Sequence, residues 1–309
     1  MDPLDTARPE DAQGPDPMGA GTPPAPHDVA RLSLASASLT DWYQVAEWAA
    51  AEGWNPGHRD ADCFHATDPA GFFIGRLDGE PVSAVSVVNY SDAYAFLGFY
   101  LVHPDHRRCG LGLATWRAAM PHAGNRLVGL DAVPAQEATY RRSGFTAVYR
   151  TTRYAGVPER ARASDADVVP VGRDHVAAIS GYDRACFPTE RGAFVQRWLT
   201  TGGHAAYVWL DRGHVAGYGV IRPARDGRRI GPLFADSRRG AEALFDALTS
   251  HLDPGEKVYV DVPDPQPEAG ALVTARGLRP DSVTARMYTG PAPETAMAAT
   301  YAVTSLELG

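Results

Sequence analysis

The sequence is short of cysteine and of lysine, and each shortage excludes a class of site. Its three cysteines, Cys63, Cys109 and Cys186, are an odd number without a CxxC spacing, which argues against a disulfide framework and against a zinc module. Lys257 is the only lysine among 29 basic residues, and Glu256 precedes it. A Walker-type phosphate loop needs lysine directly after its last glycine, so that class of nucleotide site is excluded.

Long apolar runs are also missing. No stretch approaches 18 apolar residues, and the N-terminus is acidic and proline-rich, so neither a membrane span nor a signal peptide is expected. Basic charge is in deficit, because 37 acidic residues oppose 29 basic ones and give a net charge of −8. We therefore expect a soluble cytoplasmic protein that binds neither nucleic acid nor an anionic membrane.

The length of 309 residues and an ordinary globular composition favour two domains. Residues 1–30 contain seven prolines and no apolar periodicity, which predicts a disordered tail whose acidic residues could contact a basic partner. Residues 156–166 are polar and aperiodic, which predicts a linker. These breaks define a first domain over residues 31–155 and a second over residues 167–309.

The first domain has the pattern of a mixed α/β fold. Two β-rich runs flank Asp78-Gly79, a strong hairpin signal, and a third run ends at Val102. Ser38 or Thr40 is expected to cap the first helix. The predicted order β-α-β-β-β-α-β-α-β describes a central mixed, mostly antiparallel sheet flanked by helices.

The second half repeats features of the first in the same order. Each half has a strand that ends in Asp-(Ala)-Val-Pro, then a helix stopped by glycine, then an Arg-(Met)-Tyr-x-Gly segment. The matching segments are Val128–Pro134, Gly144 and Thr151–Gly156 in the first half, and Val258–Pro263, Gly277 and Thr284–Gly290 in the second. The order predicts two copies of one fold.

The most informative segment is the turn before the helix that starts near residue 113. A strand runs into a turn that contains Gly110 and Gly112, and a helix begins at once. The first N–H groups of a helix lack internal partners and carry the positive end of the helix dipole, so the turn predicts a phosphate site. A dinucleotide loop needs GxGxxG, but Thr115 stands where the third glycine would be.

The pattern Arg107-x-x-Gly110-x-Gly112, preceded by Val102-x-Pro104, resembles the acyl-CoA loop of the GNAT superfamily of N-acetyltransferases. The resemblance covers about residues 31–155. It implies that strand residues bind the pantetheine arm and the acyl carbonyl, and that loop amides bind the pyrophosphate. The implied strand residues are Tyr100, Leu101 and Val102, and the implied loop residues are Arg107, Arg108, Cys109, Gly110, Leu111, Gly112 and Leu113. The alternative is a glycine-rich turn that caps a helix.

The resemblance also implies a proton donor. Tyr140 lies four residues before Gly144, where many family members have a tyrosine that protonates the leaving thiolate. The structural alternative is an aromatic side chain that packs a short helix. Many relatives have asparagine seven residues before this tyrosine, contacting CoA, and this sequence has Val133 there.

The general base has no such motif. No acid lies on the strand 94–102, where relatives often have glutamate, so we favour Asp131 on the next strand. Asp131 could instead pair with Arg126 or cap a helix. His103 and His106 flank the loop and are the other candidates, whereas Cys109 is interpreted as a small filler.

The second half lacks an equivalent loop. Its corresponding segment, residues 229–242, has no RxxGxG pattern, and Pro232 removes a donor, so it is predicted not to bind CoA. This arrangement, with the segments Gly181–Phe187, Ala285–Pro293 and Val303–Gly309, resembles the bacterial YitH-like group, in which a degenerate acetyltransferase-like domain follows the first. That resemblance implies a second domain that shapes the acceptor pocket. Polar groups there could come from Tyr182, Asp183, Arg191 and Asp261.

Together these features predict an acetyl-CoA-dependent N-acetyltransferase, without a metal, that acts on a primary amine of a small molecule. The amine would attack the thioester directly, with Tyr140 and Asp131 moving the protons. A protein N-acetyltransferase and a non-catalytic CoA-binding sensor are the alternatives. Both a monomer and a homodimer fit the sequence.

Overall fold

The structure is a computed structural model that describes residues 26–159 and 165–309. Most of the predicted tail and part of the predicted linker lie outside these residues. Residues 26–30, predicted to belong to the tail, instead form most of helix α1 (Pro26–Arg31). The helix has proline at its first position, and Val29 packs against a cluster that includes Leu77 and Leu111, which supplies the burial that the sequence pattern did not reveal.

The described residues form one 13-stranded mixed sheet with helices packed against it, which confirms the predicted fold class. The strands of the first half are β1 (Ser33–Ser36), β2 (Phe72–Leu77), β3 (Glu80–Asn89), β4 (Tyr94–Val102), β5 (Leu127–Ala132) and β6 (Thr146–Gly156). Those of the second half are β7 (Val168–Pro170), β8 (Ala205–Asp211), β9 (His214–Pro223), β10 (Arg228–Ala235), β11 (Val258–Pro263), β12 (Arg279–Tyr288) and β13 (Thr300–Ala302).

The longer helices lie between these strands in the chain. They are α2 (Leu39–Ala51), α3 (Asp60–His65), α4 (Leu111–Ala119) and α5 (Glu137–Arg142) in the first half, and α6 (Val176–Cys186), α7 (Gly192–Thr200), α8 (Arg238–Thr249) and α9 (Pro267–Thr274) in the second. None of the helices in the described part of the chain has the length and apolarity needed to cross a lipid bilayer.

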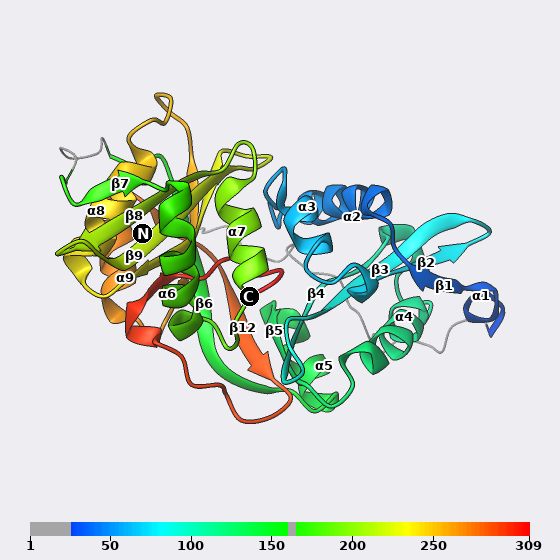
Figure 1. The fold of residues 1–309 in the computed structure, drawn as a ribbon. Helices are drawn as coiled ribbons and strands as arrows, with labels where there is room; N and C mark the ends of the chain where they lie inside the picture. Colours follow the sequence, from blue (N-terminus) through cyan, green and yellow to red (C-terminus); the bar gives the residue numbers. More distant parts are fainter. Residues whose placement is uncertain (1–25, 160–164) are drawn as a thin grey trace, which may run out of the picture.

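The two halves exchange their last long strands. The sheet order is β1-β2-β3-β4-β5-β12-β6-β11-β10-β9-β8-β7, so β12 of the second half lies between β5 and β6, and β6 of the first half lies between β12 and β11. Figure 1 shows β6 and β12 between the two halves. Each half therefore completes the sheet of the other.

This topology confirms the internal repeat. In each half the fourth and fifth long strands pair in parallel, β4 with β5 and β10 with β11, whereas their neighbours pair antiparallel. The helix that follows ends at a glycine with positive φ, Gly144 at +89° and Gly277 at +90°. These are the positions that the sequence comparison aligned.

Local sequence signals are reproduced as well. Asp78 and Gly79 have φ of +51° and +90°, as a two-residue hairpin turn between twisted strands requires. Ser38 caps α2 through a capping box, in which its hydroxyl accepts from the Asp41 backbone N–H and the Asp41 carboxylate accepts from the Ser38 N–H.

Candidate active site

Strands β4 and β5 separate part-way along their length. They pair in parallel only from Tyr94–Phe96 to Leu127–Gly129. On its other edge β4 has a bulge against β3, and Phe99 in that bulge has φ of +48°, in the left-handed region that non-glycine residues seldom adopt. A bulge of this kind re-aims the backbone beside a binding site.

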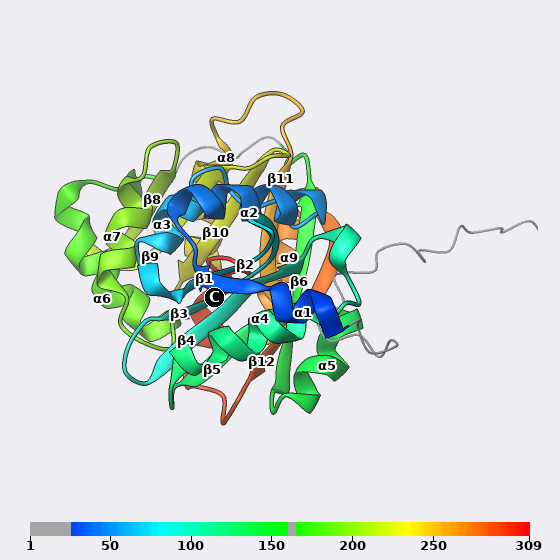
Figure 2. The same cartoon turned by 90° about the vertical axis from the view of Figure 1, so that its right-hand side faces the viewer.

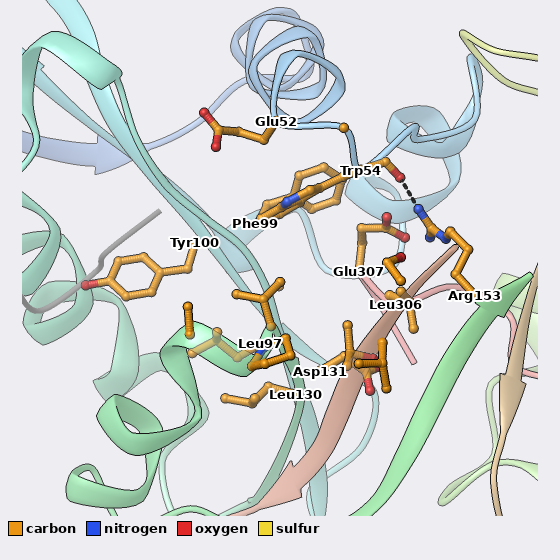
Figure 3. A pocket seen from close by; sticks show the side chains of 18 of the residues that line it. Glu52, Trp54, Leu97, Phe99, Tyr100, Leu130, Asp131, Arg153, Leu306 and Glu307 are labelled. Carbon is orange, nitrogen blue, oxygen red and sulfur yellow. Dashed lines mark hydrogen bonds between the residues drawn. The ribbon is translucent and has the colours of Figure 1, made fainter. Parts of the chain in front are cut away.

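The separated strands border a cavity of about 640 Å³. The first half contributes the end of α2, β4, β5 and α5, and the second half contributes β12 and the C-terminal segment, as Figure 3 shows in part. Of the strand residues that the resemblance implied, Tyr100 lines the cavity, whereas Leu101 and Val102 do not. Other side chains that line it are Glu52, Trp54, Leu97, Phe99, Leu130, Asp131, Val133, Tyr140, Arg153, Thr284, Leu306 and Glu307.

The loop before α4 has the geometry of an anion site. Arg108 and Gly110 have φ of +64° and +75°, and α4 starts immediately afterwards at Leu111. The backbone N–H groups of residues 108–113 donate to no described residue, and the next N–H, that of Ala114, begins the helical pattern by donating to the Gly110 carbonyl at 3.1 Å. Consecutive unpaired N–H groups at a helix start attract phosphate oxygens.

Arg107 supports this loop from within the protein. Its Nε donates to the Val102 carbonyl at 3.1 Å, and its guanidinium pairs with Glu52 at the end of α2. Arg108 is exposed, and Cys109 is partly buried beside Leu111. Arg107 thus anchors the loop, Cys109 packs beside Leu111, and anion binding by the loop backbone stays a prediction.

Tyr140, which the resemblance implied as a proton donor, lies on the cavity wall. Its side chain is 7% exposed and packs against Trp116 of α4, with ring centroids 5.8 Å apart. Its hydroxyl has no hydrogen-bond partner among the described residues. Burial raises the pKa of Tyr140 well above its ordinary value, so the phenol stays protonated at neutral pH.

Asp131 is also on the wall, but both oxygens of its carboxylate already accept hydrogen bonds within the protein. Arg286 of β12 lies directly opposite Asp131 of β5, and its guanidinium donates to both carboxylate oxygens, at 3.1 and 2.7 Å. The Asp131 side chain is completely buried. Each Asp131 oxygen thus accepts one hydrogen bond from Arg286, so its role as general base, for which it would have to take a proton beside this guanidinium, stays a prediction.

The repeat explains why an aspartate stands there. Asp261 of β11 corresponds to Asp131, and it lies directly opposite Arg153 of β6 with Nε at 2.7 Å and Nη2 at 3.0 Å. In both cases the aspartate of one half binds the arginine that the other half's exchanged strand carries. The recurring aspartate therefore forms an ion pair that joins the two halves of the chain.

Asp261 belongs to a buried ion-pair network, and two other members of this network, Arg153 and Glu307, line the cavity. Arg229 donates to Asp261 at 2.6 Å and to Glu307 at 3.0 Å, and Arg153 also donates to the Trp54 carbonyl at 2.7 Å. Burial alone would raise the pKa of Asp261, but Arg153 and Arg229 outweigh that effect and hold it well below its ordinary value.

The remaining polar candidates do not line the cavity. Tyr182 donates to Asp236, and Asp183 and Arg191 form a buried ion pair with each other. His103 and His106 lie beside the loop, away from the cavity wall.

The C-terminal segment reaches the bulged strand of the first half. A Cβ atom on Gly98 would lie 1.9 Å from the Glu307 carbonyl oxygen, so the two backbones are in direct contact. Leu308 is fixed by the Tyr90 hydroxyl, which donates to its carbonyl at 3.0 Å. Figure 1 and Figure 2 both show the C-terminus inside the molecule, at the junction of the two halves.

This contact predicts a cost for a single methyl group. Gly98→Ala is expected to lower the free energy of unfolding by about 1–3 kcal/mol, because the C-terminal segment must move to admit the Cβ. Gly181→Ala, in α6 with no atom within 4 Å of the added Cβ, is the matched control and should be neutral or stabilising. Urea unfolding of both variants measures the difference, and equal stabilities would contradict the contact.

Comparison with known proteins decides the family. Residues 38–145 match the model of the acetyltransferase (GNAT) family, and residues 179–302 match that of an acetyltransferase (GNAT) domain. The chain is 34% identical over 273 residues to holothin acyltransferase from Pseudoalteromonas sp. (strain SANK 73390), covering 88% of this chain and 93% of that protein. The chain belongs to the GNAT acetyltransferases. It is an acyltransferase with two GNAT domains in tandem, as the sequence predicted.

Solved structures of other GNAT proteins share the fold of both halves. A Pyrococcus horikoshii protein assigned to the acetyltransferases aligns with a TM-score of 0.76 at 21% identity, over 90% of this chain and 96% of that one. A tandem GNAT protein from the clavulanic acid biosynthesis pathway aligns with a TM-score of 0.61 at 18% identity, over 84% of this chain and 99% of that one.

In the second GNAT domain, another strand occupies the position that corresponds to the gap between β4 and β5. Strand β10 pairs with β11 only over residues 228–230. Further along the same edge, at Leu233 and Phe234, it pairs with β13 instead. The Ser237 hydroxyl caps α8 by accepting from the Gly240 N–H at 3.2 Å. Strand β13 thus occupies the edge of β10 beyond its pairing with β11, and Ser237 gives one N–H at the start of α8 a partner.

Proposed function

We propose that this GNAT protein transfers the acetyl group of acetyl-CoA to a primary amine of a small molecule, using the site in the first domain. The observation that carries the proposal is the run of N–H groups at residues 108–113 that donate to no described residue, in the loop that follows β4, the strand that separates from β5. These donors fit a pyrophosphate, and the gap fits an extended thiol-bearing arm. GNAT proteins generally use acetyl-CoA, which supports the choice of donor.

The chain's own residues then have distinct roles. The amides of residues 108–113 bind the pyrophosphate, and Arg107 keeps their loop in place. The bulge at Phe99 turns the β4 backbone toward the reacting carbonyl. Tyr140 holds the proton that a leaving thiolate requires. Acetyl-CoA would supply the activated acyl group as its thioester.

The acceptor is proposed to be a small molecule because of the cavity. Its volume of about 640 Å³ lies in the range of small-molecule sites, and side chains from both GNAT domains line it. The relative's name adds a specific candidate, since holothin is the compound in it. Holothin is therefore the first acceptor to test, followed by a panel of small primary amines.

The test combines acyl-CoA binding with thiol release. Gly110→Pro is expected to weaken acetyl-CoA binding about 10- to 100-fold, because proline removes one charge-assisted hydrogen bond and cannot adopt a φ of +75°. Calorimetric titration measures the Kd. Free-thiol release with the amine panel, run on the same samples, measures transfer.

Gly255→Pro is the matched control. Gly255 also has positive φ, at +85°, but it lies in an open turn with no atom within 4 Å of an added Cβ. This variant should bind acetyl-CoA like the wild type. Binding that depends on Gly110, together with thiol release, supports the proposal. Binding without release for any amine would favour a CoA sensor, and no binding at all would overturn the proposal.

A further inference from the structure

Two buried polar atoms on the cavity wall lack a hydrogen-bond partner among the described residues. They are Oε2 of Glu307 and Oγ1 of Thr284. An unpaired buried polar atom destabilises a protein, so its presence on the wall of a cavity points to a ligand that completes it. Both residues belong to the second domain, which sequence motifs had connected with the acceptor.

Glu307 is paired on one side only. Its Oε1 accepts from Arg229 at 3.0 Å, and its side chain is 3% exposed. Figure 3 places Glu307 between Trp54 and Arg153 on the wall. The three hydrogen bonds of Arg153 go to Asp261 and the Trp54 carbonyl, and none of them goes to the second oxygen of Glu307. The second oxygen of this anchored carboxylate is thus buried and accepts no hydrogen bond from a described residue.

The other two carboxylates on the described wall differ from Glu307. Asp131 has both oxygens bound to Arg286. Glu52 pairs with Arg107 of the CoA loop, and in Figure 3 its carboxylate points away from Trp54 and Glu307. Neither is as well placed to receive an N–H group in the interior of the cavity.

The surroundings of Glu307 define the rest of the ligand. Its backbone touches Gly98, next to the bulge at Phe99 where the acyl carbonyl is proposed to bind. Much of the remaining wall is apolar. It includes Trp54, Leu97, Phe99, Leu130 and Leu306. Such a wall suits an apolar or aromatic body with one amino group rather than a polyamine or a peptide.

We propose that Glu307 binds the amino group of the acceptor and takes one of its protons, and that the acceptor is a primary amine on an apolar, aromatic-sized body. This inference rests on the proposed N-acyltransferase function. It assigns Glu307 the role that the sequence had given to Asp131.

The proton transfers balance. The bound ammonium group gives one proton to Glu307 Oε2, which leaves a nitrogen lone pair. That pair forms the C–N bond with the thioester carbonyl carbon, the C–S bond breaks with its electrons going to sulfur, and sulfur takes the Tyr140 proton. The nitrogen then loses its second proton to the tyrosinate, and Glu307 returns its proton to water. The products are the amide, the free thiol and one proton.

Binding of a probe amine tests the assignment without turnover. In calorimetric titrations with the full chain, 2-phenylethylamine is expected to bind about 10-fold or more tightly than 2-phenylethanol, because only the amine gives a charged N–H donor to the carboxylate. Glu307→Gln should reduce this preference to about 2-fold or less. Glu52→Gln should keep the preference and weaken acetyl-CoA binding instead, since it releases Arg107. An amine preference that survives Glu307→Gln would overturn the inference.

A second measurement covers the case in which Glu307→Gln fails to fold because Arg229 loses its partner. In the wild type, the N,N,N-trimethyl derivative of 2-phenylethylamine keeps the charge but has no N–H group, so it should bind about 10-fold more weakly than the amine. Equal affinities would overturn the inference. Failure of the wild type to bind acetyl-CoA would instead overturn the proposed function. The amine titrations contain no acetyl-CoA, so they test the role of Glu307 separately.

Discussion

Tyr140→Phe is expected to lower kcat by about 10²- to 10³-fold while the Kd for acetyl-CoA changes by less than about 2-fold. The substitution removes one oxygen and leaves the ring, which packs against Trp116 at 5.8 Å and Phe145 at 6.1 Å. Burial keeps the phenol protonated, and no described residue accepts its proton. Thiol release at saturating amine measures kcat, and calorimetry measures Kd.

A second tyrosine, which is partly buried, provides the control. Burial also raises the pKa of Tyr149 on β6, but Tyr149 does not line the cavity. Tyr149→Phe therefore makes the same chemical change away from the site, and its kcat should stay within about 2-fold of the wild type. If both variants keep full activity, Tyr140 is packing and not a proton donor, which was the alternative the sequence left open.

Features encoded within a few residues could be predicted from the sequence. The Asp78-Gly79 turn, the Ser38 cap and the loop around Gly110 all have the conformations that their residue types indicated. Each depends on φ preferences or on hydrogen bonds between residues close in the chain. The loop could be recognised for the same reason, since Gly110 permits the left-handed backbone conformation that precedes the helix.

Features that depend on the exchange of strands could not be predicted. Asp131 is 155 positions from Arg286, and only the insertion of β12 beside β5 makes them opposite residues. The repeat already contained the signal, because the Asp and Arg of each copy recur in order, but periodicity does not say which copy they pair with. Sequence reasoning assigns no role to Glu307, although it lies in the segment Val303–Gly309, and its place follows from the path of that segment past Gly98.

Asp261→Asn is expected to lower the free energy of unfolding by about 3–5 kcal/mol, because it leaves two buried guanidinium groups facing a neutral amide. Asp261 is 3% exposed and binds both Arg153 and Arg229. Asp226→Asn is the matched control. That carboxylate also pairs with a cation, Lys257, but its side chain is 54% exposed, so its loss should cost less than about 1 kcal/mol.

The pH dependence of unfolding separates this ion pair from simple packing. The folded-state pKa of Asp261 lies below its ordinary value of 3.8, so the carboxylate contributes stability that is fully present above pH 3.8 and is lost as pH falls through the folded-state pKa. Asp261→Asn has no such group, so the gap in unfolding free energy between wild type and variant should be constant from pH 8 to about 5 and narrow below about pH 4. Chemical denaturation at each pH measures the gap. A gap that stays constant into acid would mean that Asp261 stabilises the junction of the two domains through shape and not through charge.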